Sequence, residues 1–311
     1  MSRDGVSHDP QDTRDEAFRH AWRRHRSSLS DVSEGRSSIP QARDNREPTD
    51  AREGRAQRDE RSVSTRTYYL RDCAYLLRDS EMNSLREVGK FRVVRAADLA
   101  KHAYGGDRDR MERDIRHLKR ESLVTEKNIE ISKGKALRVV TLTKTGHRLL
   151  KDTKHVAEEQ TIYHGFVKPR EAKHDADLYR LYQKEAARLE RAGSRPVRVI
   201  LDYELKRNLN RDLALLGQEK DDPDRRSQVA AKHGLAVVDG KIPVPDLRLE
   251  YETPDLELQR VDLELATRDY RPRALAEKAR AGFSLYGRPE DASRLRRILD
   301  ERELTARILT L

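Results

Sequence analysis

The C-terminal third of the chain carries two carboxylates that could act on one ion. Asp246 follows Pro245 at the start of Asp246–Tyr251, in which polar and apolar residues alternate as expected of a half-buried strand. A second stretch of this kind, Gln259–Ala266, carries Glu264 on its polar face. Because side chains alternate between the two faces of a strand, Asp246 and Glu264 can converge from neighbouring strands. Carboxylate oxygens brought together suit Mg²⁺, so we expect these two residues to be metal ligands.

Each acid also has a purely structural interpretation. Asp246 could cap a turn or pair with Arg248 or Arg260. Glu264 is harder to explain in this way, because a carboxylate inside a strand disfavours the sheet unless it has a partner. The sequence shows neither a Cys or His pair with zinc-ligand spacing nor a phosphate-binding glycine loop.

The elements around these acids predict an α/β domain over residues 171–311. Before the two acid-bearing strands we expect helices at Ala172–Ala192, 202–216 and Arg225–His233, an acidic loop at Glu219–Asp224, and strands at Val197–Leu201 and Leu235–Val238. A helix should follow residue 266. The expected order is a helix, a strand, a strand with Pro-Asp, a strand with Asp-x-Glu and a helix. This order resembles the core of the PD-(D/E)XK nucleases.

That resemblance implies further catalytic residues. In those nucleases the first helix often supplies a glutamate, for which Glu185 is the best candidate, and a lysine follows the second acid by two residues. Ala266 stands at that place here, whereas Lys278 in the next helix could reach the same space, as migrated lysines do in some branches of the family. If the site is active, Asp246, Glu264, Lys278 and Glu185 would be its catalytic residues, with Mg²⁺ as cofactor. The sequence leaves open whether the protein is an Mg²⁺-dependent DNA endonuclease.

The positive charge of the chain lies mainly in another segment. Of the net charge of +10, residues 64–155 contribute most, because they hold 22 basic and 13 acidic side chains. A concentrated excess of this kind predicts a polyanionic partner. We expect double-stranded DNA to be bound by the outward face of a helix at Arg108–Glu121 and by a following hairpin. The expected DNA-binding residues are Arg108, Arg110, Arg113, Arg116 and Lys119 on the helix, and Lys133, Lys135 and Arg138 on the hairpin.

The order of elements in this segment predicts how these cations are presented. From the sequence we expect five helices, namely from Ser64 or Thr65 through Leu77, at Glu81–Val88, at Ala96–Tyr104, at Arg108–Glu121 after the cap Asp107, and from Thr143. We also expect an extended run at 91–94 and strands at Leu123–Ile131 and Ala136–Leu142. This is the order of a winged helix-turn-helix. The run Leu118–Thr125, followed by Val140–Thr143, Gly146 and Leu149-Leu150, resembles the MarR-like and PadR-like branches, although Ser122 stands where they usually have glycine.

The two halves together resemble the replication-relaxation family of bacterial plasmids and integrative elements. The residues that carry this resemblance are His174-Asp175, Pro245-Asp246, Val261–Glu264, Lys278 and Tyr286, behind a winged helix. It implies a role in replication, relaxation or mobilisation of DNA, with a homodimer and the element's replication or transfer proteins as further partners. One alternative is a non-enzymatic transcriptional regulator or accessory factor. A winged-helix scaffold that binds only proteins is another.

Composition sets the remaining expectations for the 311 residues. Charged residues make up 39% and hydrophobic residues 35%, and the segment 1–63 has no apolar period, so we expect a disordered tail there. The predicted organisation is an α+β protein with this tail, a winged-helix domain at 64–155, a linker at 156–170 and a PD-(D/E)XK-like domain at 171–311. One cysteine, no signal peptide and no membrane-length apolar run predict a soluble protein of the cytoplasm that does not bind membranes.

Overall fold

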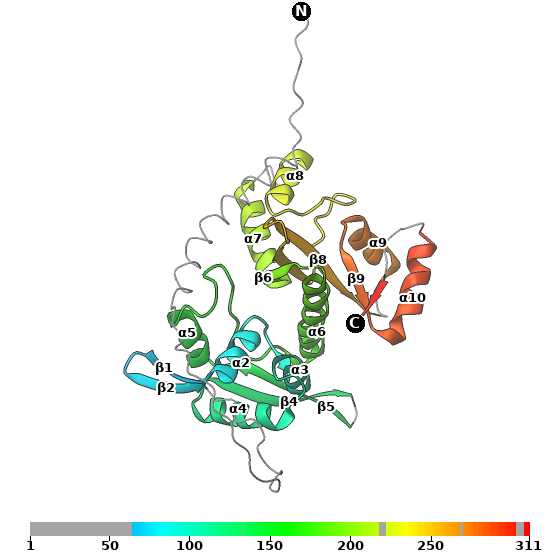
Figure 1. The fold of residues 1–311 in the computed structure, drawn as a ribbon. Coiled ribbons are helices and arrows are strands. Elements are labelled where there is room, and N and C mark those ends of the chain that lie inside the picture. Colours follow the sequence, from blue (N-terminus) through cyan, green and yellow to red (C-terminus); the bar gives the residue numbers. More distant parts are fainter. Residues whose placement is uncertain (1–63, 133, 218–221, 268–269, 303–307) are drawn as a thin grey trace, which may run out of the picture. The chain divides into compact units, whose positions relative to one another are not determined.

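The computed structural model describes residues 64–311, apart from 133, 218–221, 268–269 and 303–307. Thr65–Leu311 form one compact unit. They combine helices with strands, which confirms the predicted α+β class (Figure 1). The predicted tail at 1–63 lies outside the described residues, as does much of the predicted acidic loop near residue 220. In the part of the chain that is described, no helix combines the length and the apolar character needed to span a membrane.

The chain enters this unit as a β-hairpin, so the helix predicted from Ser64 is wrong. Strands β1 (Thr65–Leu70) and β2 (Cys73–Arg78) pair antiparallel, and Arg71 in the turn between them has a φ of 52°. Tyr68, Leu70, Tyr75 and Leu77 are buried, whereas Tyr69 and Leu76 between them are exposed. This burial has a period of two, and aromatic residues favour strands, which explains why the helical interpretation failed.

The next elements follow the predicted order to within a few residues. They are α2 (Asp79–Gly89), β3 (Val94–Arg95), α3 (Ala96–Ala103), α4 (Arg108–Arg120), β4 (Val124–Ser132), β5 (Lys135–Leu142) and α5 (Lys144–Asp152). The strands form a sheet in the order β3-β5-β4, with antiparallel pairs. The side chain of Asp107 accepts a hydrogen bond from the Arg110 N–H, 2.9 Å away, and so caps α4 as predicted.

Two backbone constraints fix how α4 ends and α5 begins. Ser122 has a φ of 57°, and the Leu123 N–H donates to the Leu118 carbonyl at 2.9 Å, a helix end that glycine usually provides. A Cβ atom at Gly146 would lie 2.1 Å from the carbonyl oxygen of Leu123. Glycine at this position therefore lets α5 lie directly on the chain that leaves α4.

The second half contains a larger set of elements. They are α6 (Pro169–Arg191), β6 (Arg195–Leu201), α7 (Asp202–Leu215), α8 (Pro223–Lys232), β7 (Leu247–Glu252), β8 (Leu258–Ala266), α9 (Pro272–Arg280), β9 (Ser284–Gly287), α10 (Pro289–Asp300) and β10 (Ile308–Thr310). The predicted strand Leu235–Val238 is wrong, because only a single bridge joins Val238 to Lys241 around the turn at Asp239 and Gly240. Strands β9 and β10 were not predicted from the sequence.

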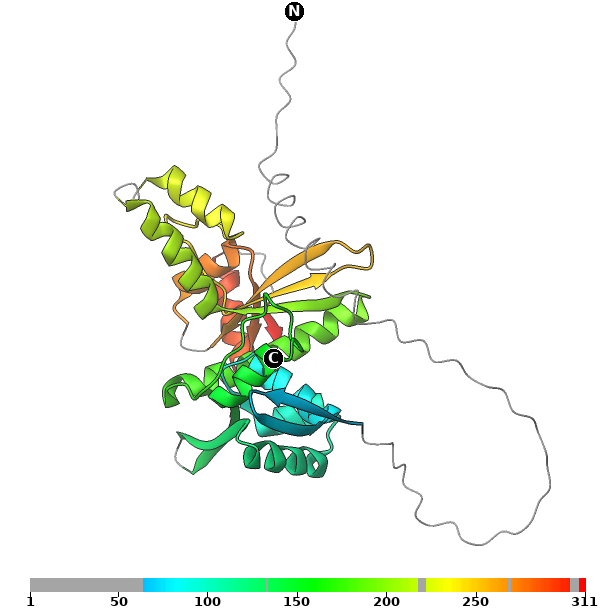
Figure 2. The same ribbon diagram turned by 90° about the vertical axis from the view of Figure 1, so that its left-hand side faces the viewer.

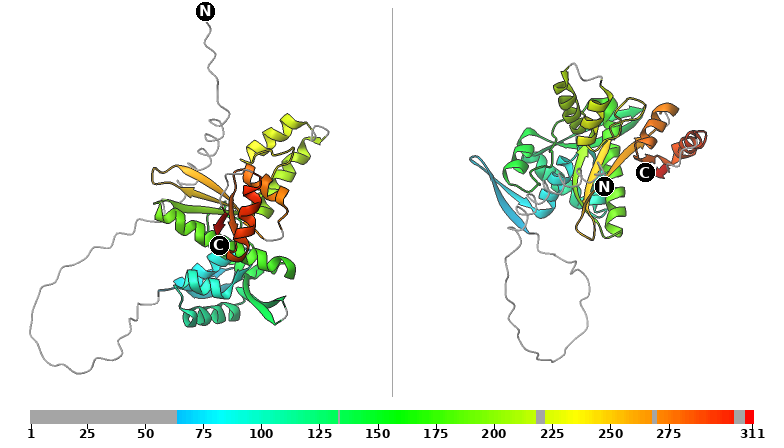
Figure 3. Two further views of the ribbon diagram at one scale, coloured as in Figure 1. Left: turned by 90° about the vertical axis from the view of Figure 1, so that its right-hand side faces the viewer. Right: turned by 90° about the horizontal axis from the view of Figure 1, so that it is seen from above.

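These strands form a five-stranded mixed sheet in the order β10-β9-β8-β7-β6. Strands β6, β7 and β8 pair antiparallel, whereas β9 is parallel to β8 and to β10. Helices α9 and α10 pack near the β9–β10 edge, and α7 packs with α8 (Figure 3). Helix α10 thus packs on the two strands at the β10 edge, and α9 packs on α10.

Helix α6 joins the two halves of the unit. It packs on β6, β7 and β8 and also on α3, β3 and β4 (Figures 1 and 2). The ring of Tyr179 on α6 meets Phe91 edge-on, with 5.2 Å between ring centroids. In the segment predicted as a linker, Ile162 is buried in the same core, and the Gln160 side chain bonds both the N–H and the carbonyl of Val199. One continuous core thus runs through both halves.

Candidate functional site

The structure brings Asp246 and Glu264 together at the start of β7. The pairing of Leu247 with Leu263 places the residue before β7 beside the end of β8. The Asp246 N–H donates to Oε2 of Glu264 at 3.2 Å, and the Leu265 N–H donates to Oδ2 of Asp246 at 2.9 Å. The convergence that strand alternation predicted is therefore present.

Lys278 reaches the same place from α9. Its Nζ lies 2.9 Å from Oε1 and 3.0 Å from Oε2 of Glu264, and it also donates to the Val244 carbonyl at 2.6 Å. The Tyr270 hydroxyl donates to Oε1 of Glu264. Glu264 is fully buried. Burial and the charge of Asp246 raise the pKa of Glu264 to about 7, against the opposing effects of Lys278 and Tyr270.

His174, at the N-terminal end of α6, completes the group. Its Nε2 lies 3.3 Å from Oδ2 of Asp246, and its Nδ1 lies 3.6 Å from Oδ1 of Asp175. Burial would lower the pKa of His174, but the adjacent carboxylates of Asp175 and Asp246 outweigh this and raise it to about 10. Burial would raise the pKa of Asp246, yet the adjacent imidazole of His174 holds it below the usual value. We call His174, Asp246, Glu264, Tyr270 and Lys278 the carboxylate cluster.

Glu185 does not join this cluster. It accepts a hydrogen bond from the Tyr286 hydroxyl at 2.5 Å and pairs with Arg188. It lies about 16 Å along α6 from His174, at 1.5 Å per residue. Tyr286 pairs with Leu265, and the side chains of both lie in the core with α6. Glu264 is the neighbour of Leu265 in β8, so its side chain points to the other face of the sheet. Strand alternation therefore separates Glu185 from the two acids.

The residues of the cluster do not fit a preformed Mg²⁺ site. Among the described residues, no group of three or more His, Cys, Asp or Glu side chains could hold a metal ion. Lys278 and Tyr270 already occupy the carboxylate of Glu264. A protonated His174 can donate to Asp246 but cannot ligate a metal. As it stands, the arrangement can share protons and balance charge, and it offers no open set of oxygen ligands.

The predicted DNA-binding residues lie on and beside α4. Met111, Ile115 and Leu118 are buried, whereas the five predicted cations of this helix are exposed, Arg108, Arg110, Arg113, Arg116 and Lys119. A hollow of about 770 Å³ is lined by Arg78, Arg113, Arg116, Lys119 and Arg120. Arg78 and Arg120 were not among the predicted residues, and Arg78 already pairs with Glu81 and Asp114. Arg120 could have been found from its neighbours on the helix, whereas Arg78 comes from the end of β2 and gives no local signal.

Of the cations predicted on the hairpin, Arg138 is engaged in ion pairs within the chain. Arg138 lies 2.5 Å from Glu112 and 2.6 Å from Glu126, so it ties β5 to α4 and β4. Its hydrogen bond holds the pKa of Glu112 below the usual value. Lys119 also pairs with Glu126. Lys133 lies outside the described residues, and Lys135 begins β5.

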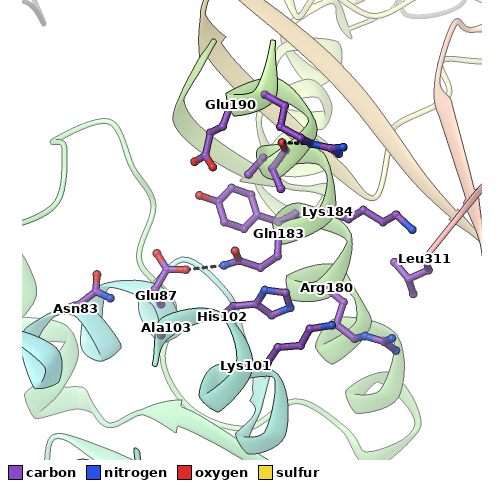
Figure 4. A pocket seen from close by; sticks show the side chains of 14 residues that line it. Asn83, Glu87, Lys101, His102, Ala103, Arg180, Gln183, Lys184, Glu190 and Leu311 are labelled. Carbon is purple, nitrogen blue, oxygen red and sulfur yellow. Dashed lines mark hydrogen bonds between the residues drawn. The ribbon is translucent and has the colours of Figure 1, made fainter. Parts of the chain in front are cut away.

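A second hollow, of about 590 Å³, opens between α2, α3 and α6 (Figure 4). Lys101, Arg180 and Lys184 line it, and Gln183 donates to Oε2 of Glu87 across it at 3.0 Å. None of its lining residues belongs to the carboxylate cluster or to the exposed face of α4.

Comparison with known proteins adds no relative. No model of a protein family matches the chain, and no curated protein matches it significantly.

Proposed function

We propose that this chain is a DNA-binding protein that contacts duplex DNA through the exposed face of α4. The observation that carries the proposal is the set of exposed arginines on this helix, whose inner side buries an apolar stripe. Arg108, Arg110 and Arg113 make no ion pair with another described residue. Arginine side chains without internal partners are available to phosphates and base edges.

The surroundings of α4 support a winged helix-turn-helix. Helix α3 precedes it across the turn at Gly105 and Gly106, and the β4–β5 hairpin follows it. In such folds the second helix lies in the major groove and the hairpin contacts the backbone beside it. Arg138 is engaged with Glu112 and Glu126, so in this proposal it positions the hairpin against α4.

The second half supports the resemblance to PD-(D/E)XK nucleases in its element order. Helix α6 precedes the antiparallel strands β6, β7 and β8, and α9 then leads to β9, which is parallel to β8. Together with the α4 face, this order supports the replication-relaxation resemblance. We therefore propose a role in replication, relaxation or mobilisation of a plasmid or integrative element.

Within that role, the contacts of the carboxylate cluster favour an accessory factor over an endonuclease. Both carboxylates are compensated by cations of the chain itself, and the glutamate expected from α6 lies on the other face of the sheet. An accessory factor would use the winged helix to hold DNA and the second domain to contact partner proteins or a second copy of the chain.

Duplex affinity as a function of salt tests the DNA-binding proposal. The experiment uses the full chain and a fluorescent duplex of about 30 base pairs, for which the slope of log affinity against log salt changes by about 0.9 for each phosphate contact. Arg113→Ala with Arg116→Ala should weaken binding and reduce the slope by about 2. Arg296→Ala with Arg297→Ala on α10 removes the same charge elsewhere and is the matched control. Equal loss in both double variants would contradict the assignment to α4.

Cleavage of supercoiled plasmid with Mg²⁺ or Mn²⁺ tests the choice between accessory factor and endonuclease. The accessory factor leaves the plasmid intact. Nicking that disappears in both Asp246→Ala and Glu264→Ala would establish the endonuclease instead.

A further inference from the structure

The carboxylate cluster is closed by contacts within the chain. Oε1 of Glu264 meets the Tyr270 hydroxyl and Lys278, and Oε2 meets Lys278 and the Asp246 N–H. Oδ2 of Asp246 meets the Leu265 N–H and His174. Both oxygens of the buried glutamate are therefore already satisfied by donors.

The ionisable side chains of the cluster are also paired without an added ion. Lys278 lies 2.9 Å from Glu264, and His174 lies 3.3 Å from Asp246. Lys278 and His174 come from different elements, α9 and α6. A buried carboxylate is costly unless paired, and here each acid has its own cation.

A divalent ion would compete with these cations for the same atoms. Mg²⁺ binds oxygen ligands at about 2.0–2.1 Å in a near-octahedral arrangement. Lys278 contacts both oxygens of Glu264, so the ammonium would have to leave before an ion could bind there. At the place where a nuclease-type lysine is expected, Ala266 provides no donor that could replace it.

We infer that Lys278 and His174 take the place of a metal ion, so that the cluster is a metal-independent ionic junction between α6, β7, β8 and α9. The junction excludes divalent cations because its own ammonium holds the position that they would need. This inference concerns the second half of the chain and does not depend on DNA binding.

Binding of Mn²⁺ tests the inference directly, because the electron paramagnetic resonance signal of free Mn²⁺ is lost when the ion binds. The protein is the full chain, and the variants are Lys278→Met, which removes the ammonium, and Lys278→Arg, which keeps a cation. Lys241→Met is the matched control, because Lys241 pairs with Glu277 on the same helix α9 but lies outside the cluster. Asp246→Asn in the Lys278→Met background shows whether any bound ion uses the cluster.

The wild type, Lys278→Arg and Lys241→Met should show no saturable binding at submillimolar Mn²⁺. Lys278→Met should bind roughly tenfold more tightly or better, since a unit charge a few ångströms from the ion has been removed, and Asp246→Asn should abolish the gain. Saturable submillimolar binding by the wild type would overturn the inference. Equal affinity of the wild type and Lys278→Met would overturn the claim that the ammonium excludes the ion.

A stability measurement keeps the inference testable if Lys278→Met folds poorly. Glu264→Gln removes the opposite charge. The double variant Glu264→Gln, Lys278→Met should therefore lose less free energy of unfolding in urea than the sum of the losses of the two single variants. Purely additive losses would show that the two side chains do not form a junction.

Discussion

Removing the carboxylate of Asp114 should destabilise the part of the fold that holds α4. Asp114 lies on the inner side of α4 and is 1% exposed. It accepts hydrogen bonds from the Ser80 hydroxyl at 2.6 Å and the Tyr104 hydroxyl at 3.1 Å, and it pairs with Arg78 at 3.0 Å. These partners belong to α2, the end of α3 and the end of β2, so a single carboxylate connects α4 to three neighbouring segments.

The size of the loss follows from these contacts. Each of the two hydrogen bonds contributes about 1 kcal/mol. Breaking a buried ion pair costs roughly 3–5 kcal/mol, but the Arg78 side chain is 32% exposed, so water compensates part of this loss. Allowing about 1 kcal/mol for the ion pair, Asp114→Ala should lower the free energy of unfolding by about 3 kcal/mol.

Urea denaturation followed by circular dichroism measures this quantity. Asp109→Ala, at an exposed position of the same helix, is the control and should change the free energy of unfolding by less than about 0.5 kcal/mol. The combination of Asp114→Ala with Arg78→Met should cost less than the sum of the two single changes, because they remove the same ion pair. A loss below about 1 kcal/mol for Asp114→Ala would refute the idea that this carboxylate fixes α4.

Three further changes follow from the described contacts. Gly146→Ala places a Cβ 2.1 Å from the Leu123 carbonyl oxygen and should destabilise the protein by roughly 2 kcal/mol or more in urea, whereas Thr145→Ala beside it should have little effect. Ser122→Gly relieves a φ of 57° and should stabilise by about 0.5–1 kcal/mol; a loss of stability would mean that the serine side chain is needed there. The pKa of His174 is raised to about 10. Its contribution to the stability of the fold is therefore complete below the pKa of histidine in the unfolded chain, about 6.5, and is lost as the pH rises toward 10. The difference in free energy of unfolding between the wild type and His174→Gln should therefore shrink steadily above a pH of about 6.5. A difference that grows with pH would contradict the assigned ion pair.

Sequence patterns predicted the elements whose periodicity is strong. The buried stripe of α4, its cap at Asp107 and the alternation in β7 and β8 all depend on local spacing, and the structure has them where the spacing put them. The convergence of Asp246 with Glu264 followed from the same alternation. Tyr68–Leu77 was misread because its aromatic and leucine residues fit a helical stripe as well as a hairpin, and the turn at Arg71 and Asp72 contains no glycine or proline.

The partners of the site residues were harder to predict, because they depend on tertiary contacts. His174 reaches Asp246 across 72 positions of the chain, and Arg78 reaches Asp114 across 36. Glu185 was expected from the resemblance to the PD-(D/E)XK nucleases, in which the first helix often supplies a glutamate, but helix spacing does not say which face of a sheet a side chain meets. Tyr270 gave no signal, since a single tyrosine between a strand and a helix has no pattern to mark it.

The exposed arginines of α4 are the proposed contact with duplex DNA. The most direct measurement is the salt dependence of duplex affinity for the wild type, the Arg113→Ala, Arg116→Ala variant and the α10 control variant. We expect a steep slope in the wild type and the control, and a slope smaller by about 2 in the α4 variant. A wild type that does not bind duplex DNA at low salt, or an α4 variant that binds as the wild type does, would contradict it.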